Sequence, residues 1–192
     1  VMNQQRQVVY TRRRKILEGN FDTSFMGDGI RSIAEGIVSK HSPETSNNAS
    51  WDFEAVNKEL SAEFHTPIDI QKNAGLNIDG ILDPIADLLL KAYDEKKRKV
   101  GVELMTRIEA YVYLQIIDQS WKEHLRAMDT LQDAVRLRSY GQRDPLQEYK
   151  REAFKLFESL MIRIEDETVL ALLRMPPPEL QLEDAPRVME PD

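Results

Sequence analysis

Cysteine is absent from the 192 residues of this chain. Its absence excludes disulfide bonds, thiolate catalysis and cysteine-ligated metal sites, and it fits a reducing compartment. No apolar run approaches the roughly 18 residues that a membrane-spanning helix requires, and no segment resembles a signal peptide. We therefore expect a soluble protein of the cytosol.

Signals for β-strands are also missing, because no stretch alternates apolar and polar residues with a period of two. Glycine and proline are few, at eight and nine residues. Hydrophobic residues make up 41% of the chain and charged residues 31%, so the chain can bury a core as one domain or two small ones. These features predict an all-α fold.

The usual motifs of catalytic and cofactor sites are lacking as well. A phosphate-binding loop of the form G-x-x-x-x-G-K-[ST] does not occur, since Gly27 and Gly29 are followed by Ile30 and Arg31. None of the three histidines has a glutamate three positions before it, which removes the Glu-x-x-His pairs of di-iron bundles. No constellation separates a general acid from a general base. We expect no catalytic residue, metal or cofactor in this chain.

The net charge of −7 is unevenly distributed, with basic segments at residues 1–19 and 91–151 and acidic segments elsewhere. Nucleic-acid binding is not expected, because it requires a dominant basic face. The basic run Arg12–Lys15 fits a solvated or partner-facing helix surface better than a contact with phosphate or anionic lipid.

The longest regular pattern runs from Val102 to Arg174 and predicts two amphipathic helices joined at Ser139–Pro145. Apolar residues at steps of three and four mark one face of the first arm: Leu114, Ile117, Trp121, Leu125, Met128, Leu131 and Val135. The second arm shows the same spacing in Tyr149, Ala153, Leu156, Phe157, Leu160 and Ile164. The arms would form a long antiparallel hairpin, about 55 Å and 44 Å in length, which suits a mechanical element better than a catalytic scaffold.

Shorter helices are expected before the hairpin, and an acidic, proline-rich tail after it. The predicted helices are Val1–Leu17, Asp28–Lys40, Asp52–Phe64 and a helix that begins at Gly80 or Asp83. Because a glycine inside a helix costs only about 1 kcal/mol, we expect the last of these to run almost continuously through Gly101 into the hairpin.

Two residues of the first arm, Trp121 and His124, have competing interpretations. Trp121 is either a core residue or a point where the hairpin docks on another domain, and the two are weighed equally. His124, beside Trp121 and Leu125 at the edge of the seam, is better explained by packing or hydrogen bonding than as a metal ligand or base.

The tip of the hairpin carries cations and an aromatic residue around a glycine turn. A contact with a polypeptide through Arg138, Tyr140, Gly141, Gln142 and Arg143 is favoured over the alternative, a solvated turn that makes no contact. A tyrosine can contact a chain through both its ring and its hydroxyl without requiring one sequence.

The segments Trp121–Leu125, Leu137–Pro145 and Glu148–Glu152 resemble SecA, the motor ATPase of bacterial preprotein translocation, and Val1–Arg6 resembles the start of that family's scaffold helix. The resemblance covers residues 1 to 175. It implies a scaffold-helix segment at 1–19, a helical wing domain at 20–100, a two-helix finger at 101–175 and a flexible linker at 176–192.

The resemblance also implies a function without catalysis. In the SecA family the finger lies at the mouth of the SecY channel, its tip tyrosine, here Tyr140, contacts the preprotein, and the finger region restrains the motor ATPase. Trp121, His124 and Leu125 would be the regulatory or docking residues. ATP and Mg²⁺ belong to motor domains of the parent chain, and the family's cysteine-rich zinc-binding segment has no counterpart here.

The family resemblance also implies where the protein is located and which partners it has. The implied location is the cytoplasm, with peripheral association to the inner membrane. Preprotein, SecY and the parent's motor domains are the implied partners, and an anionic lipid surface and self-association stay open. The alternative hypothesis is a self-contained helical adaptor that binds a folded partner.

Overall fold

The computed structural model describes residues 1–41, 53–70, 78–138 and 144–176. Within these ranges the chain forms six helices and no strand: α1 (Met2–Leu17), α2 (Phe25–His41), α3 (Phe53–Phe64), α4 (Ile78–Val100), α5 (Val102–Arg138) and α6 (Pro145–Arg174). The predicted all-α fold is confirmed. Helix α5 has 37 residues and ends before the predicted loop, and α6 has 30 residues and begins at Pro145, the last residue of that loop.

Contacts divide the chain into two compact units. The first unit joins Val1–Met26 to Ile108–Thr168, and the second joins Gly27–Arg107 to the described residues from Val169 onward. The long helices therefore contribute to both units. The first residues of α5, up to Arg107, and the last residues of α6, from Val169, belong to the second unit. The domain limits implied by the family resemblance remain a prediction.

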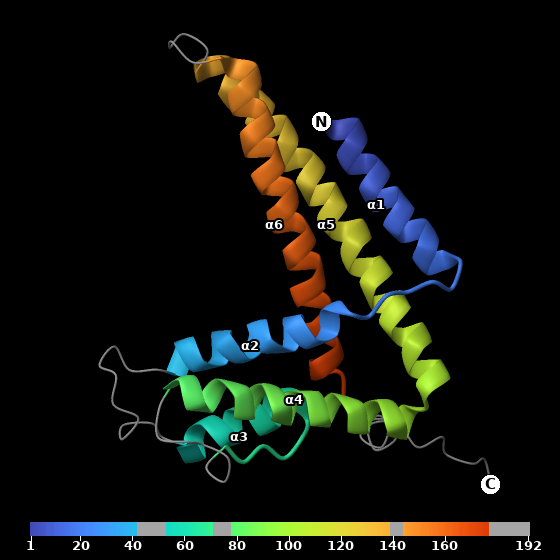
Figure 1. The fold of residues 1–192 in the computed structure, drawn as a ribbon, viewed down its shortest axis with the longest axis vertical. Helices are drawn as coiled ribbons and strands as arrows, with labels where there is room; N and C mark the ends of the chain where they lie inside the picture. Colours follow the sequence, from blue (N-terminus) through green and yellow to red (C-terminus); the bar gives the residue numbers. More distant parts are fainter. Residues whose placement is uncertain (42–52, 71–77, 139–143, 177–192) are drawn as a thin grey trace, which may run out of the picture. The chain divides into compact units, whose positions relative to one another are not determined.

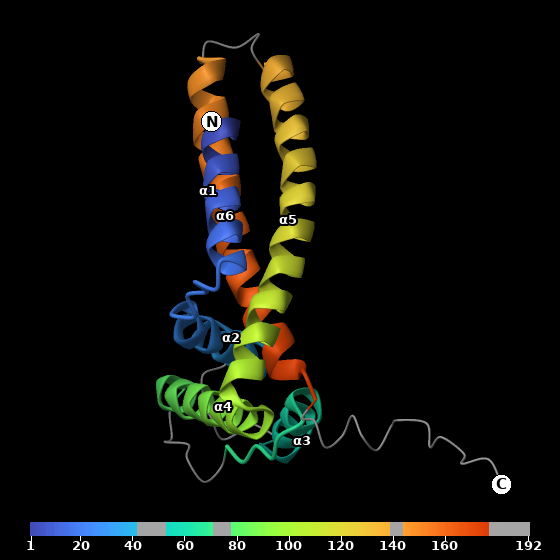
Figure 2. The same cartoon turned by 90° about the vertical axis from the view of Figure 1, so that its right-hand side faces the viewer.

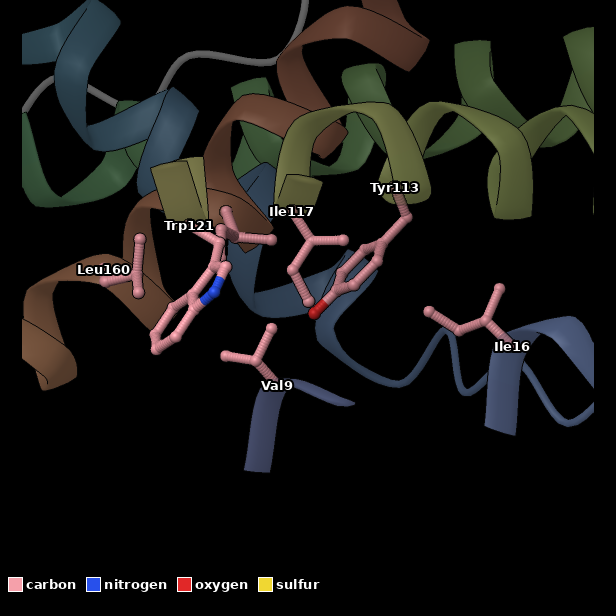
Figure 3. Packing of buried hydrophobic residues seen from close by; sticks show 7 residues of the cluster. Val9, Ile16, Tyr113, Ile117, Trp121 and Leu160 are labelled. Atoms are coloured by element: carbon pink, nitrogen blue, oxygen red, sulfur yellow. The ribbon is translucent and has the colours of Figure 1, made fainter. Parts of the chain in front are cut away.

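The first unit consists of α1 and the larger parts of α5 and α6, and α1 lies beside both long helices in Figures 1 and 2. Two apolar clusters form its core. One cluster takes residues from all three helices, as Figure 3 shows: Val9, Ile16, Tyr113, Ile117, Trp121, Leu160 and Ile164. The second lies nearer the tip and contains Met128, Leu131, Val135 and Ala153. The apolar stripes that the sequence predicts are thus buried against one another.

Helices α2, α3 and α4 make up most of the second unit. Their buried faces follow helical spacing, with Ile30, Ala34 and Ile37 on α2, Val56, Leu60 and Phe64 on α3, and Ile81, Ile85 and Leu89 on α4. After α3, the chain turns back along the helix. The backbone N–H of Ile68 donates to Ser61 Oγ at 2.8 Å, and that of Ile70 donates to Asn57 Oδ1 at 3.0 Å. These bonds satisfy backbone donors that regular structure does not pair.

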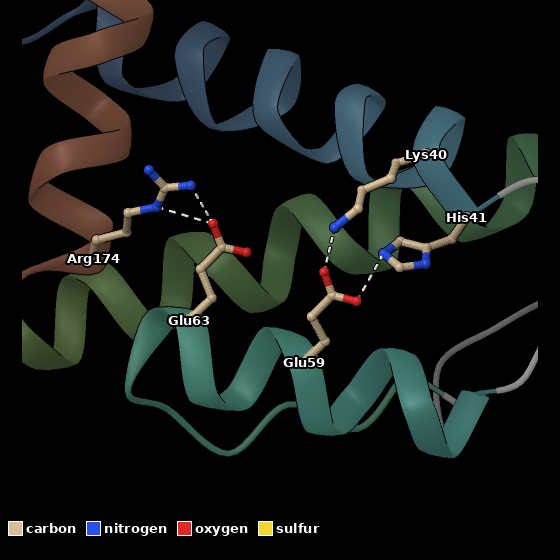
Figure 4. A network of polar contacts seen from close by, with 5 residues as sticks. All are labelled: Lys40, His41, Glu59, Glu63 and Arg174. Atoms are coloured by element: carbon tan, nitrogen blue, oxygen red, sulfur yellow. Dashed lines mark hydrogen bonds and ion pairs between the residues drawn. The ribbon is translucent and has the colours of Figure 1, made fainter.

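One face of α3 carries a pair of carboxylates that hold it to two other helices (Figure 4). Glu59 forms an ion pair with Lys40 at the end of α2 and lies 3.6 Å from His41 Nε2. Glu63, one turn later, accepts a hydrogen bond from Arg174 Nε of α6 at 2.9 Å. The pairs are partly exposed, so they fix the orientation of α3 more than they stabilise the unit.

The helix predicted to run through Gly101 is interrupted there, and that expectation was wrong. Gly101 has a φ of +91°, and it separates α4, which ends at Val100, from α5, which begins at Val102. Only glycine reaches such a φ without a steric penalty. The N–H of Gly101 donates to the carbonyl of Lys97 at 3.0 Å, which closes the last turn of α4. The residue therefore acts as a helix C-cap instead of an interior glycine.

Gly29 is required for the packing of α2 against the end of α6. A Cβ atom at this position would lie 2.6 Å from Cγ2 of Val169. We predict that Gly29→Ala lowers the free energy of unfolding by about 1–2 kcal/mol, because overpacking exceeds the gain in helix propensity. Urea denaturation followed by circular dichroism measures the change. The matched control is Gly36→Ala on the same helix, where a Cβ meets nothing within 4 Å; equal effects of the two changes would contradict the packing explanation.

Candidate functional site

Helix α1 lies on the α5–α6 pair through a seam with a seven-residue repeat. Met2, Val9 and Ile16 recur every seven residues and contact the apolar clusters of the first unit. The seam positions three residues after Met2 and Val9 are polar, and these residues, Gln5 and Arg12, also lie seven residues apart. An apolar heptad position alternating with a polar one fixes the register of a helix pair, at a cost in stability.

Gln5 connects all three helices by two buried hydrogen bonds. Its Nε2 donates to the carbonyl of Ala153 in α6 at 3.0 Å, and its Oε1 lies 3.0 Å from Nε2 of His124 in α5. Because the amide nitrogen already donates, the amide oxygen must accept, so His124 carries a proton on Nε2. Gln5 is 6% exposed and His124 is 4% exposed, so water does not replace these partners.

His124 is enclosed by aromatic rings from two helices. The Trp121 ring stacks on it at a centroid distance of 5.4 Å, and the Phe157 ring approaches edge-on at 5.8 Å. Burial, aided by the positive charge of Arg163, lowers the pKa of His124. The imidazole is therefore neutral at pH 7, which suits a structural hydrogen-bond donor and not a cationic contact.

A second polar contact follows two turns along α1. Arg12 Nη1 donates to the hydroxyl of Tyr113 at 2.7 Å and to Glu165 Oε1 at 2.8 Å, which again joins α1, α5 and α6. Burial raises the pKa of Tyr113, and the Arg12 charge partly opposes the rise. The neighbouring Arg13 donates from Nε to Asp118 Oδ1 at 3.0 Å. The basic run of α1 is thus partly engaged with carboxylates of the long helices.

The residues predicted to have a regulatory or docking role, Trp121, His124 and Leu125, lie where α1 packs on α5 and α6. Trp121 and His124 are buried, and Leu125 is half-buried against the same apolar cluster. Trp121 is a core residue in the structure, and part of the surface it packs on comes from α1. Their assignment as regulatory or docking residues remains a prediction.

The predicted tip lies outside the described residues. This applies to Tyr140, Gly141, Gln142 and Arg143, while Arg138 is the last residue of α5 and its side chain is not described. The neighbouring described residue, Leu137, is 78% exposed. The contact role of the tip remains a prediction.

The site also contains residues for which the sequence predicted no role in it: Gln5, Arg12, Tyr113 and Glu165. A signal was present, because Gln5 and Arg12 interrupt the apolar spacing of α1 at equivalent heptad positions. Their partners come from positions more than 100 residues away, and a single sequence does not reveal such pairs.

Two hollows border α1 in the first unit. A cleft of about 620 Å³ is lined by α1, the segment that follows it and the aromatic rings of Phe21, Phe25 and Tyr113. An apolar groove of about 420 Å³ runs between α1 and α6, lined in part by Val8, Phe154 and Phe157. Phe154 is 65% exposed there. Both hollows leave apolar side chains of the scaffold accessible to other chains.

Within the described ranges, no group of three His, Cys, Asp or Glu side chains is placed to hold a metal ion. None of the helices described combines the length and apolarity that crossing a membrane demands.

Known proteins match almost the whole chain. The family described as the SecA wing and scaffold domain matches residues 1–176. The protein translocase subunit SecA of Solibacter usitatus is 37% identical over 169 residues, covering 88% of this chain and 18% of the relative. The same subunit from Chlorobium luteolum is 41% identical over 177 residues, covering 92% and 17%, and that of Cellvibrio japonicus is 38% identical over 181 residues, covering 92% and 20%.

The similarity is continuous across both units and all six helices. The chain spans about a fifth of the length of these relatives. The residues matched by the family include α1 with its polar seam, the helices of the second unit, and the long pair α5 and α6. This chain belongs to the SecA wing and scaffold family and corresponds to that part of a protein translocase subunit.

Proposed function

We propose that this chain is the non-catalytic, force-transmitting part of a SecA-like ATP-driven protein translocase. The supporting observation is the attachment of α1 to both long helices by buried or partly buried polar contacts from Gln5 and Arg12. Such contacts have defined geometry, so a displacement of α1 along its axis would be passed to α5 and α6 without slipping by a turn.

The long helices then act as a lever that ends at the tip. Helix α5 alone extends for about 55 Å at 1.5 Å per residue. In the proposal, Arg138, Tyr140, Gly141, Gln142 and Arg143 contact the translocating preprotein at the entrance of the SecY channel. Trp121, His124 and Leu125 keep the lever attached to α1, and through it the lever restrains the motor domains of the parent chain.

The proposal places ATP and Mg²⁺ outside this chain. Gly27 and Gly29 lie in helix α2 and not in a loop between a strand and a helix, as a phosphate-binding loop requires. Nucleotide binding would therefore belong to the remainder of a longer protein. The proposed location is the cytoplasmic face of the inner membrane, to which the translocase associates peripherally.

The test is the change Tyr140→Ala in the full-length parent translocase. We predict a loss of ATP-driven preprotein transport of about tenfold or more, since one large aromatic contact is worth about 1–3 kcal/mol. Transport into SecY-containing inverted vesicles is measured with protease protection. The matched control is Tyr111→Ala, because Tyr111 lies on α5, away from the tip, and is 64% exposed.

The two tyrosine variants distinguish a tip contact from a general effect of losing an aromatic side chain. Normal transport by both variants would contradict the role given to the tip. Equal impairment of both would show that the effect does not depend on the tip. A self-contained adaptor would leave transport unaffected and would retain its partner after either change.

A further inference from the structure

The second unit contains a lysine that is almost entirely buried. Lys96 lies on α4, one turn before Gly101, and its side chain is 5% exposed. Its ammonium group donates to three backbone carbonyls: Leu172 at 3.1 Å, Leu173 at 2.6 Å and Met175 at 2.6 Å. The three acceptors match the three protons that an ammonium group offers.

These carbonyls are the ones that a helix leaves without partners at its C-terminal end. Helix α6 ends at Arg174, and the next residues are Met175 and Pro176, with no glycine to form the usual C-cap. Proline also lacks the N–H that could bond back to the helix. Lys96 therefore supplies from another helix the donors that the local sequence does not, and its charge opposes the negative end of the helix dipole.

Charged groups near this contact are engaged with one another. Glu95 pairs with Lys99 along α4, and Arg174 at the end of α6 pairs with Glu63 of α3. The hydrogen-bond partners of the Lys96 ammonium group are neutral backbone carbonyls. Burial lowers the pKa of Lys96 from its ordinary 10.5 to about 8.

We propose that Lys96 is a proton-linked clamp that fixes the last turn of α6 to α4, so that opening of this turn is accompanied by uptake of a proton. In the closed clamp the amine is desolvated, so burial favours loss of one proton, and the neutral amine still donates to two of the three carbonyls. In the open state it is hydrated and holds its proton. The proposal concerns only the second unit and does not depend on the function proposed for the whole protein.

The direction of the pH effect follows from linkage. The closed state has a pKa of about 8 and the open state the ordinary 10.5, so the open state binds more protons between these values. Raising the pH through this range therefore favours the closed clamp. Going from pH 7 to pH 9, the opening equilibrium should fall by roughly tenfold. Below about pH 7 it should hardly change.

The experiment uses the complete 192-residue chain and two readouts. Nuclear magnetic resonance of lysine labelled with ¹³C at Cε measures the titration of Lys96 in the wild type. Millisecond hydrogen exchange, followed by mass spectrometry of peptides that cover residues 169–176, measures the opening of the last turn. Exchange rates are corrected for the intrinsic effect of pH, and the variants are Lys96→Met and Lys91→Met.

We expect Lys96 to titrate well below its ordinary 10.5, and protection of residues 172–175 to rise about tenfold from pH 7 to pH 9. Lys96→Met should reduce this protection at pH 7 by about tenfold and remove its pH dependence. Lys91→Met, which removes an exposed lysine on the same helix, should behave as wild type. A Lys96 resonance that titrates near its ordinary 10.5, or protection in the wild type that is independent of pH, would overturn the proposal, and both are readable even if Lys96→Met does not fold.

Discussion

Replacing Trp121 by alanine is expected to lower the free energy of unfolding of the first unit by about 3–5 kcal/mol. Trp121 is 7% exposed and packs in the cluster that all three helices share. The change removes a large apolar surface and leaves a cavity that helices of this length cannot close by a local shift. It also removes the ring that stacks on His124. Urea denaturation followed by circular dichroism at 222 nm measures the loss.

The control for this prediction is Phe154→Ala on α6. Phe154 is also a large aromatic residue of the first unit, but it is 65% exposed, so its removal should change stability by less than about 1 kcal/mol. If Trp121→Ala is as mild as this control, Trp121 does not belong to the core. In that case a docking role on another domain would become the better explanation of the residue.

The helices of the first unit could be predicted because their signals are local. Apolar residues at steps of three and four, with the Gly-x-x-Asp-Pro turn between them, predicted the end of α5, the beginning of α6 to within one residue, and the end of α6. The clusters contain the predicted stripe residues, such as Ile117, Met128 and Ile164. Helical periodicity is strong over runs of 30 residues or more, since each added turn repeats the same evidence.

The join between α4 and α5 could not be predicted in the same way. Propensity treats Gly101 as a residue that a helix tolerates at about 1 kcal/mol, and it does not say whether the chain needs a positive φ there. The clamp of Lys96 on α6 is similar, because a lysine in a charged run is ordinarily expected to be solvated. In each case the deciding contact comes from tertiary structure.

The polar seam shows a further limit of a single sequence. His124 was expected to pack or to form a hydrogen bond, and its contacts with Gln5, Trp121 and Phe157 agree with that expectation. The identity of its partner could not be derived, because Gln5 is 119 positions away and glutamine is common on exposed helix faces. The family resemblance supplied the role of the finger tip, and the physical attachment of the finger to α1 came from the structure.

The attachment leads to the second large prediction, which concerns Gln5→Leu. Leucine has a similar size and would fill the position without a cavity, so the change isolates the two hydrogen bonds. It leaves the Nε2–H of His124 buried without its present partner, while the carbonyl of Ala153, inside α6, loses the Gln5 amide but keeps its helical hydrogen bond. An unsatisfied buried donor costs about 1–3 kcal/mol, so we expect the free energy of unfolding to fall by about 1–3 kcal/mol despite the added apolar surface.

The matched control is Gln7→Leu on the same helix, where the side chain is exposed and the change should stay within about 0.5 kcal/mol. Urea denaturation of both variants gives the difference. A spin-label pair on α1 and α6, introduced by cysteines into this cysteine-free chain, reports whether α1 keeps its register. A broader distance distribution in Gln5→Leu alone would show that the polar contact specifies the position of α1. A Gln5→Leu variant that is as stable as wild type, with an unchanged distance distribution, would contradict this prediction. It would mean that the apolar residues Val9 and Ile16 are enough to position α1. The lever would then lack the defined attachment that force transmission requires.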